Sequence, residues 1–76
     1  MDKIVRETDA DLWIEQIFAA KAVAEGGVIR RNRHWIAREV GRERFFREVA
    51  ERGFHLLETG DQLVVICHQG RIYLHF

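Results

Sequence analysis

Proline and serine are both absent from this chain, and cysteine occurs only once. Without serine the chain cannot be a serine hydrolase, and a single cysteine cannot form an internal disulfide. Long apolar runs are missing too, because the longest, Leu63–Cys67, has five residues against the roughly 20 that span a membrane. These absences favour a cytoplasmic protein with no membrane partner, since a chain without disulfides suits a reducing compartment.

The composition that remains is that of a folded domain. The 76 residues are 47% hydrophobic and include five Phe, two Trp and one Tyr. Such a chain can form a hydrophobic core, although it is near the lower size limit for doing so without disulfides or metals. No repeat, linker or low-complexity segment interrupts it. We therefore predict a single domain over residues 1–76.

Helical spacing of apolar residues predicts a first helix over about Asp9–Ala24, which Gly26 and Gly27 end. A short β-prone step, Val28–Ile29, follows it. The chain then enters its arginine-rich segment.

The segment 33–52 is predicted to form two helices rather than one. At about 100° per residue its apolar side chains fall into two sets that point roughly 150° apart. The first set comprises Ile36, Ala37 and Val40, and the second comprises Trp35, Phe45, Phe46, Val49 and Ala50. One straight helix cannot bury both sets against the same core. A break at Gly41 would allow both sets to be buried, so we predict helices over about 33–40 and 42–52 in helix-turn-helix geometry.

After Gly53 the apolar pattern changes to a period of two, which predicts strands. Phe54–Leu57 and Leu63–Cys67 flank a turn, and a second turn at Gln69–Gly70 leads into a third predicted strand, Arg71–Phe76. In such a meander one face would pack against the helices. That face would carry Phe54, Leu56, Leu63, Val65, Cys67, Ile72, Leu74 and Phe76.

These elements predict an α+β fold with three helices and a C-terminal antiparallel β-meander. Helix, strand, helix, helix and hairpin is also the element order of a winged helix, which the chain resembles. In a winged helix the first strand pairs beside the last hairpin strand, a place that the third meander strand would take here. We therefore predict a winged-helix-like fold, with a plain α+β sandwich as the alternative.

The second face of the predicted sheet combines apolar and polar side chains. It would carry His55, Leu57, Val64, Ile66, Tyr73 and His75. Three helices in so small a domain are not expected to cover both faces, and an exposed apolar face beside an open edge strand is typical of an interface. Our first hypothesis is a small non-enzymatic binding or adaptor module whose partner is a protein or a second copy of the chain.

Eight of the ten arginines lie within residues 29–53. Because guanidinium groups suit phosphates, DNA or RNA binding is the alternative hypothesis. It would use Arg30, Arg31, Arg33, Arg42, Arg44 and Arg47. Carboxylates at a spacing of four, however, pair Arg44 with Glu48, Glu43 with Arg47, and Glu48 with Arg52. Such pairs compete with phosphate for the arginines, so this hypothesis ranks second.

The histidines and the cysteine form no recognisable catalytic or metal pattern. His55, His68 and His75 would share a sheet face, but their spacing matches no zinc signature. Cys67 precedes His68, and neighbouring strand residues point to opposite faces, so the two form no dyad. We expect no enzyme activity, no metal and no cofactor.

Two stretches carry a resemblance, "WIEQIFAAKAVAEGGVIRR" (13–31) and "EVGRERFFREVAERGFHLLETGDQLVVIC" (39–67). They resemble short bacterial proteins of uncharacterised function, some of which are labelled phosphoribosylanthranilate isomerase. That isomerase is a TIM barrel of typically about 250 residues, which 76 residues cannot form. No matching catalytic pair is present either, so the resemblance implies no activity and no site residues here.

Overall fold

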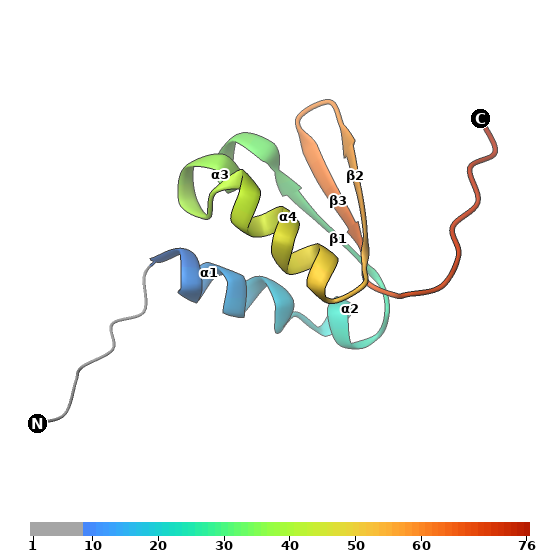
Figure 1. Ribbon diagram of the computed structural model, residues 1–76, viewed down its shortest axis with the longest axis horizontal. Coiled ribbons are helices and arrows are strands. Elements are labelled where there is room, and N and C mark those ends of the chain that lie inside the picture. Colours follow the sequence, from blue (N-terminus) through green and yellow to red (C-terminus); the bar gives the residue numbers. More distant parts are fainter. Residues whose placement is uncertain (1–8) are drawn as a thin grey trace, which may run out of the picture.

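The computed structural model describes residues 9–76 as four helices and three strands (Figure 1). In chain order these are α1 (Asp9–Phe18), α2 (Lys21–Ala24), β1 (Val28–Asn32), α3 (Arg33–Glu39), α4 (Arg42–Glu51), β2 (His55–Thr59) and β3 (Gln62–Ile66). The helices α1, α3 and α4 lie on one side of an antiparallel sheet. The protein therefore has the predicted α+β fold, with α2 as an additional short helix. No helix of the described part is long and apolar enough to cross a membrane.

The first helix is shorter than predicted, because the chain turns between α1 and α2. Ala20 is extended (φ −61°, ψ 147°) at this turn, although alanine is the best helix former. Ile14 and Ile17 are buried on α1, while Ala22 and Val23 pack against the core from α2. The turn lets both pairs reach the core, so tertiary packing overrides the local propensity.

The predicted break between the next two helices is confirmed at Gly41. Its backbone has φ 94° and ψ 129°, a conformation that glycine adopts far more readily than other residues. Its N–H donates to the Ile36 carbonyl at 2.8 Å, and its own carbonyl accepts from the Phe45 N–H at 3.0 Å. The change of direction lets Val40 on one side and Val49 on the other both reach the core.

The central strand of the sheet is β3, with the order β1-β3-β2. Val28 of β1 and His55 of β2 both lie opposite Ile66 of β3, on its two edges. The prediction of a third meander strand at Arg71–Phe76 is wrong, because β1 already occupies the second edge of β3 and residues 67–76 contain no strand. With β1 beside β3, the arrangement is winged-helix-like.

The core lies between the helices and the inner face of the sheet. It consists of Ile14, Ile17, Ile29, Ile36, Val40, Phe45, Val49, Leu63, Val65 and Cys67. Phe54 and Leu56 pack at its margin, as their predicted place on the inner face requires. Ile72, Leu74 and Phe76 were predicted on the same face but are exposed, since their segment does not join the sheet.

Candidate interaction surfaces

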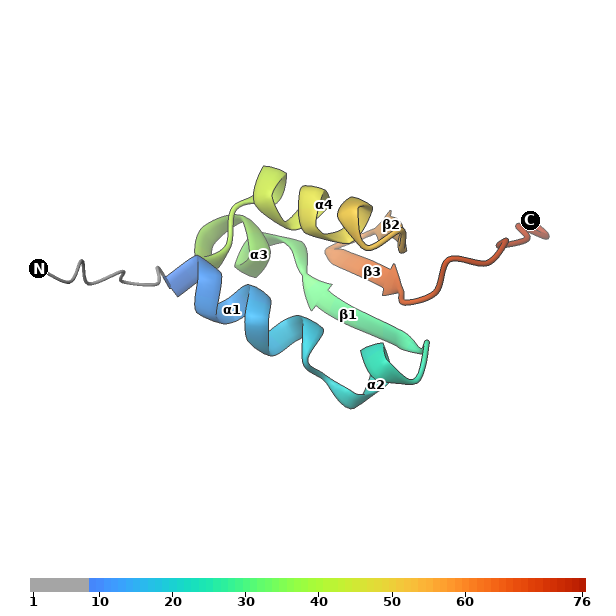
Figure 2. The same ribbon diagram turned by 60° about the horizontal axis from the view of Figure 1, so that its bottom comes forward.

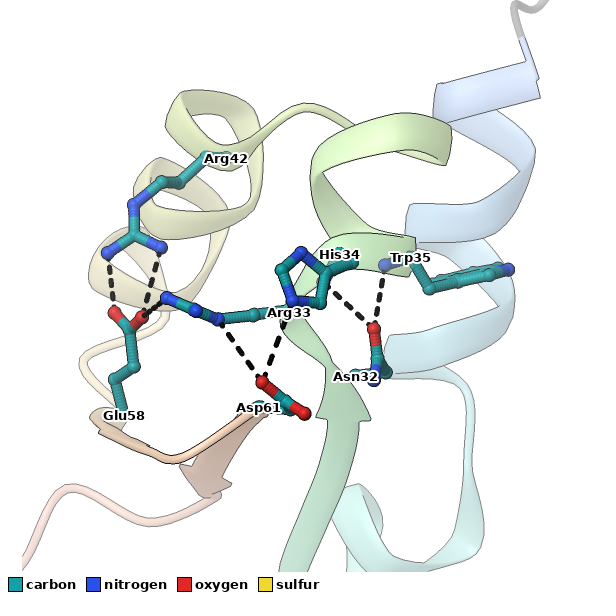
Figure 3. Close-up of polar contacts among 7 residues, drawn as sticks. All are labelled: Asn32, Arg33, His34, Trp35, Arg42, Glu58 and Asp61. Carbon is teal, nitrogen blue, oxygen red and sulfur yellow. Dashed lines mark hydrogen bonds and ion pairs between the residues drawn. The ribbon is translucent and has the colours of Figure 1, made fainter.

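A cluster of ion pairs connects the tip of the β2–β3 hairpin to α3 and α4 (Figure 3). Glu58 accepts hydrogen bonds from Arg42 Nη2 at 2.5 Å and from Arg33 Nη1 at 3.3 Å. Asp61 in the turn lies 3.8 Å from Arg33 Nε and 3.6 Å from His34 Nε2. The hydrogen bond from Arg42 is the main reason that the pKa of Glu58 is below its ordinary value. The cluster therefore holds the hairpin in contact with the first turns of α3 and α4.

Asn32 sets the direction in which α3 leaves β1 (Figure 3). Its Oδ1 accepts from the backbone N–H groups of His34 and Trp35 at 2.9 and 3.0 Å. This cap satisfies two N–H groups that have no partner inside the helix. The first turn of α3 then holds Trp35 against Trp13 of α1, with ring centroids 4.8 Å apart and ring planes at 78°.

Glu48 joins two arginines on the surface of α4. It accepts from Arg44 Nε at 2.8 Å and from Arg52 Nη1 at 2.7 Å. The hydrogen bond from Arg52 is the largest cause, and that from Arg44 the second, of a Glu48 pKa below its ordinary value. Arg44 also donates to Asp11 Oδ1 at 2.8 Å, which links α4 to α1. Two of the three predicted pairs at a spacing of four are therefore confirmed.

The six arginines proposed for nucleic-acid binding do not form one free surface. Arg33, Arg42 and Arg44 pair with carboxylates. Arg47 is exposed on α4, and no ion pair joins it to Glu43 within residues 9–76. The remaining two arginines lie on a different element, β1.

Those two, Arg30 and Arg31, border a cleft of about 660 Å³ between α1, β1 and α3. Arg31 Nη1 donates to the Arg30 carbonyl at 2.7 Å. Trp13 and Trp35 line the same cleft. The sequence alone does not reveal this site, because nothing in the spacing of the two tryptophans shows that they meet.

None of the helices in the described part of the chain covers the outer face of the sheet (Figures 1 and 2). Strand pairing arranges its central side chains in two rows, Val28–Ile66–His55 and Arg30–Val64–Leu57. Val28 and Leu57 at the two edges remain 49% and 47% exposed. The structure thus brings together four of the six predicted interface residues, and adds Val28 and Arg30 from β1. Alternation along Val28–Ile29 was the sequence signal that could have placed Val28 on this face.

Tyr73 and His75, the other two predicted interface residues, do not join this face. They lie in residues 71–76, which lead away from the sheet (Figure 1). Just before this segment, Gly70 lies beside His55 at the start of β2. There His55 Nε2 donates to the Gly70 carbonyl at 2.5 Å, and its ring lies 5.7 Å from that of His68. Beyond this point Ile72, Tyr73, Leu74 and Phe76 are all exposed.

His55 and His68 are not joined by further metal-binding side chains. Within residues 9–76 no three His, Cys, Asp or Glu side chains lie close enough together to hold a metal ion.

No protein-family model, curated protein or solved structure matches the chain. The resemblance to short bacterial proteins therefore stays untested, and function has to be argued from the geometry of the surfaces.

Proposed function

We propose that the chain is a small non-enzymatic binding module that meets a protein partner through the outer face of its sheet. The observation that carries this proposal is an exposed apolar surface: Val28, Leu57, Val64 and Ile66 are adjacent across three strands, and none of the described helices α1 to α4 lies over them. A continuous apolar face of this kind is typical of a protein interface. Arg30 and His55 supply polar groups at its margin, as interface rims commonly do.

A second copy of the chain is the partner that these observations favour. Residues 71–76 form another uncovered apolar segment, in which Leu74 and Phe76 are almost fully exposed. Within residues 9–76 the sheet also has two edges, on β1 and β2, that pair with no other strand. Two copies can cover each other's apolar surfaces at once, which a symmetric dimer does with a single type of contact.

The environment of Cys67 supports a non-enzymatic role and a cytoplasmic location. Its side chain is only 3% exposed, and burial raises the pKa of its thiol. A buried thiol with a raised pKa is a poor nucleophile. As a reduced core residue it suits a compartment in which thiols stay reduced.

Nucleic-acid binding through the basic segment is the weaker proposal, because half of its six arginines already pair with carboxylates. Titration of duplex DNA at two salt concentrations tests it. Binding through several phosphates would weaken steeply with salt. Charge reversal at Arg31 and Arg44 that leaves a measured affinity unchanged would exclude it.

Sedimentation velocity of the wild type and two matched variants tests the main proposal. Leu57 on the outer face and Leu12 on α1 are almost equally exposed, at 47% and 45%. We expect a dimer at tens of micromolar for the wild type and for Leu12→Lys, and a monomer for Leu57→Lys, because a buried lysine charge costs solvation. A monomeric wild type, or equal effects of the two substitutions, would contradict the proposal.

A further inference from the structure

The cleft between α1, β1 and α3 has the size of a small-molecule site. Its volume of about 660 Å³ falls within the range of roughly 300–1,000 Å³ that is usual for ligand pockets. Its walls come from three different elements that the Asn32 cap and the Trp13–Trp35 contact hold in place. The cleft is thus a feature of the fold rather than of one loop.

The charged groups that line the cleft are all positive. They are those of Arg31 and Arg38. Arg30 also borders the cleft, but its side chain lies in the outer-face row with Val64 and Leu57. Among residues 9–76, no carboxylate lines the cleft. Arg31 has no ion-pair partner within residues 9–76, whereas Arg38 pairs with Glu39 at 2.9 Å just outside the cleft. Guanidinium groups without carboxylate partners favour a multiply charged anion, and their planar forks match phosphate oxygens.

The uncharged lining fits a planar group with a polar edge. Trp13 and Trp35 stand nearly perpendicular, so a flat ring that stacks on one of them turns its own edge toward the face of the other. Stacking on tryptophan is a common way for proteins to bind a nucleobase. Gln16 and Asn32 add side-chain amides. Since Asn32 Oδ1 already caps α3, its amide N–H groups remain to donate to a base edge.

We propose that this cleft binds a nucleoside phosphate, with the base against Trp13 and Trp35 and the phosphate on Arg31. The nucleotide is either free or the end of a single strand, because the same contacts serve both. The site is separate from the outer face of the sheet, because Arg30 and Arg31 are neighbours in β1 and their side chains point to opposite faces. Its test therefore relies first on Arg31.

Tryptophan fluorescence reports on this cleft selectively, since the chain has two tryptophans and both line it. Adenosine monophosphate should quench the emission along a saturable curve. Adenosine, which lacks the phosphate, should require about tenfold higher concentration, and inorganic phosphate, which lacks the base, should quench little. Quenching that is linear and unsaturable, or equal for nucleotide and nucleoside, would overturn the proposal.

Arg31→Gln and Arg47→Gln form a matched pair, because each removes one positive charge but only Arg31 lines the cleft. Arg31→Gln should raise the Kd for the nucleotide about tenfold, while Arg47→Gln should leave it unchanged. Equal effects would mean that only net charge matters. If Arg31→Gln lowers the urea midpoint, Arg38→Gln replaces it, because Arg38 lines the cleft from α3, and a loss of affinity in the same direction is expected.

Two further ligands separate the sources of the nucleotide. A short single-stranded oligonucleotide that binds much more tightly than the mononucleotide, with a steep salt dependence, identifies a strand as the ligand. An oligonucleotide that binds with the same affinity as the mononucleotide, counted per strand end, identifies the free nucleotide as the ligand. Polyglutamate that competes as well as the nucleotide would overturn the proposal in favour of an acidic peptide.

Discussion

Replacing Gly41 by alanine should destabilise the protein through the backbone alone. At φ 94° and ψ 129°, residues with a Cβ are strained by about 1–3 kcal/mol. No atom of residues 9–76 lies within 4 Å of the position that an added Cβ would take, so no steric collision with them adds to this cost. Alanine also restricts the unfolded chain, which offsets about 0.4–1 kcal/mol. We expect a net loss of about 1–2 kcal/mol.

This loss is large for a domain of this size. At roughly 0.05–0.15 kcal/mol per residue, the total stability is about 4–11 kcal/mol for 76 residues. Urea unfolding followed by tryptophan fluorescence measures the change directly, and a melting temperature should fall by about 4–8 °C for each kcal/mol lost.

Gly60 in the hairpin turn provides the control. Its φ of 56° is left-handed, and here too a Cβ would meet nothing within 4 Å. Asparagine tolerates the left-handed region, so Gly60→Asn should cost less than Gly60→Ala. At Gly41 asparagine should cost as much as alanine, because ψ lies far from the left-handed well. A Gly41→Ala variant as stable as the wild type would refute the view that this backbone conformation separates α3 from α4.

Three further predictions concern the thiol, the ion pairs and residues 71–76. Cys67 is 3% exposed and burial raises its thiol pKa, so a thiol reagent at neutral pH should react far more slowly with the native protein than in urea; equal rates would contradict its place in the core. The pKa values of Glu48 and Glu58 are lower in the folded protein than their ordinary 4.5, so the stability they contribute is complete above that pH and is lost as the pH falls further. Glu48→Gln should cost about 1–2 kcal/mol at neutral pH and make the urea midpoint less sensitive to acid, whereas an unchanged acid dependence would mean that Glu48 is not involved. At a protein concentration low enough for the chain to be monomeric, deleting residues 71–76 should change stability by less than about 0.5 kcal/mol, because their large apolar side chains are exposed. A larger loss in urea unfolding at that concentration would mean that they pack on the domain.

The helix pair was predictable because its signal is local. Two apolar sets that point in different directions, with one glycine between them, require a break at that glycine. Trp35 is the exception that angle alone could not place, since it falls with the set of α4. The structure shows why: it packs against Trp13 of α1, a contact between residues far apart in the sequence.

The strand partners were not predictable in the same way. Alternation identified β3 and its inner face correctly, but it says nothing about which strand pairs with which. Both Val28–Ile29 and Arg71–Phe76 have β-prone sequences, and β3 has a single edge left beside β2. Val28–Ile29 takes that edge because Ile29 lies opposite Val65 and both are buried in the core.

The candidate surfaces also combine local features, which the sequence predicts, with contacts between distant residues, which it does not. His55, Leu57, Val64 and Ile66 alternate along two adjacent strands, so their common face could be inferred from the sequence. The pairing of Arg44 and Arg52 with Glu48 is also local, at a spacing of four residues. The contact of Arg42 and Arg33 with Glu58 joins distant parts of the chain, and no sequence pattern predicts it.

Methyl NMR shifts recorded across a dilution series test the central claim most directly, because they locate the contact surface residue by residue. The methyl groups of Val28, Leu57, Val64 and Ile66 should shift together as the protein concentration falls from hundreds to a few micromolar. Those of Ile36 and Leu63, which are fully buried, should not move and serve as an internal reference. Concentration-independent spectra, or shifts confined to α4, would contradict the proposal that the outer face of the sheet is the binding surface.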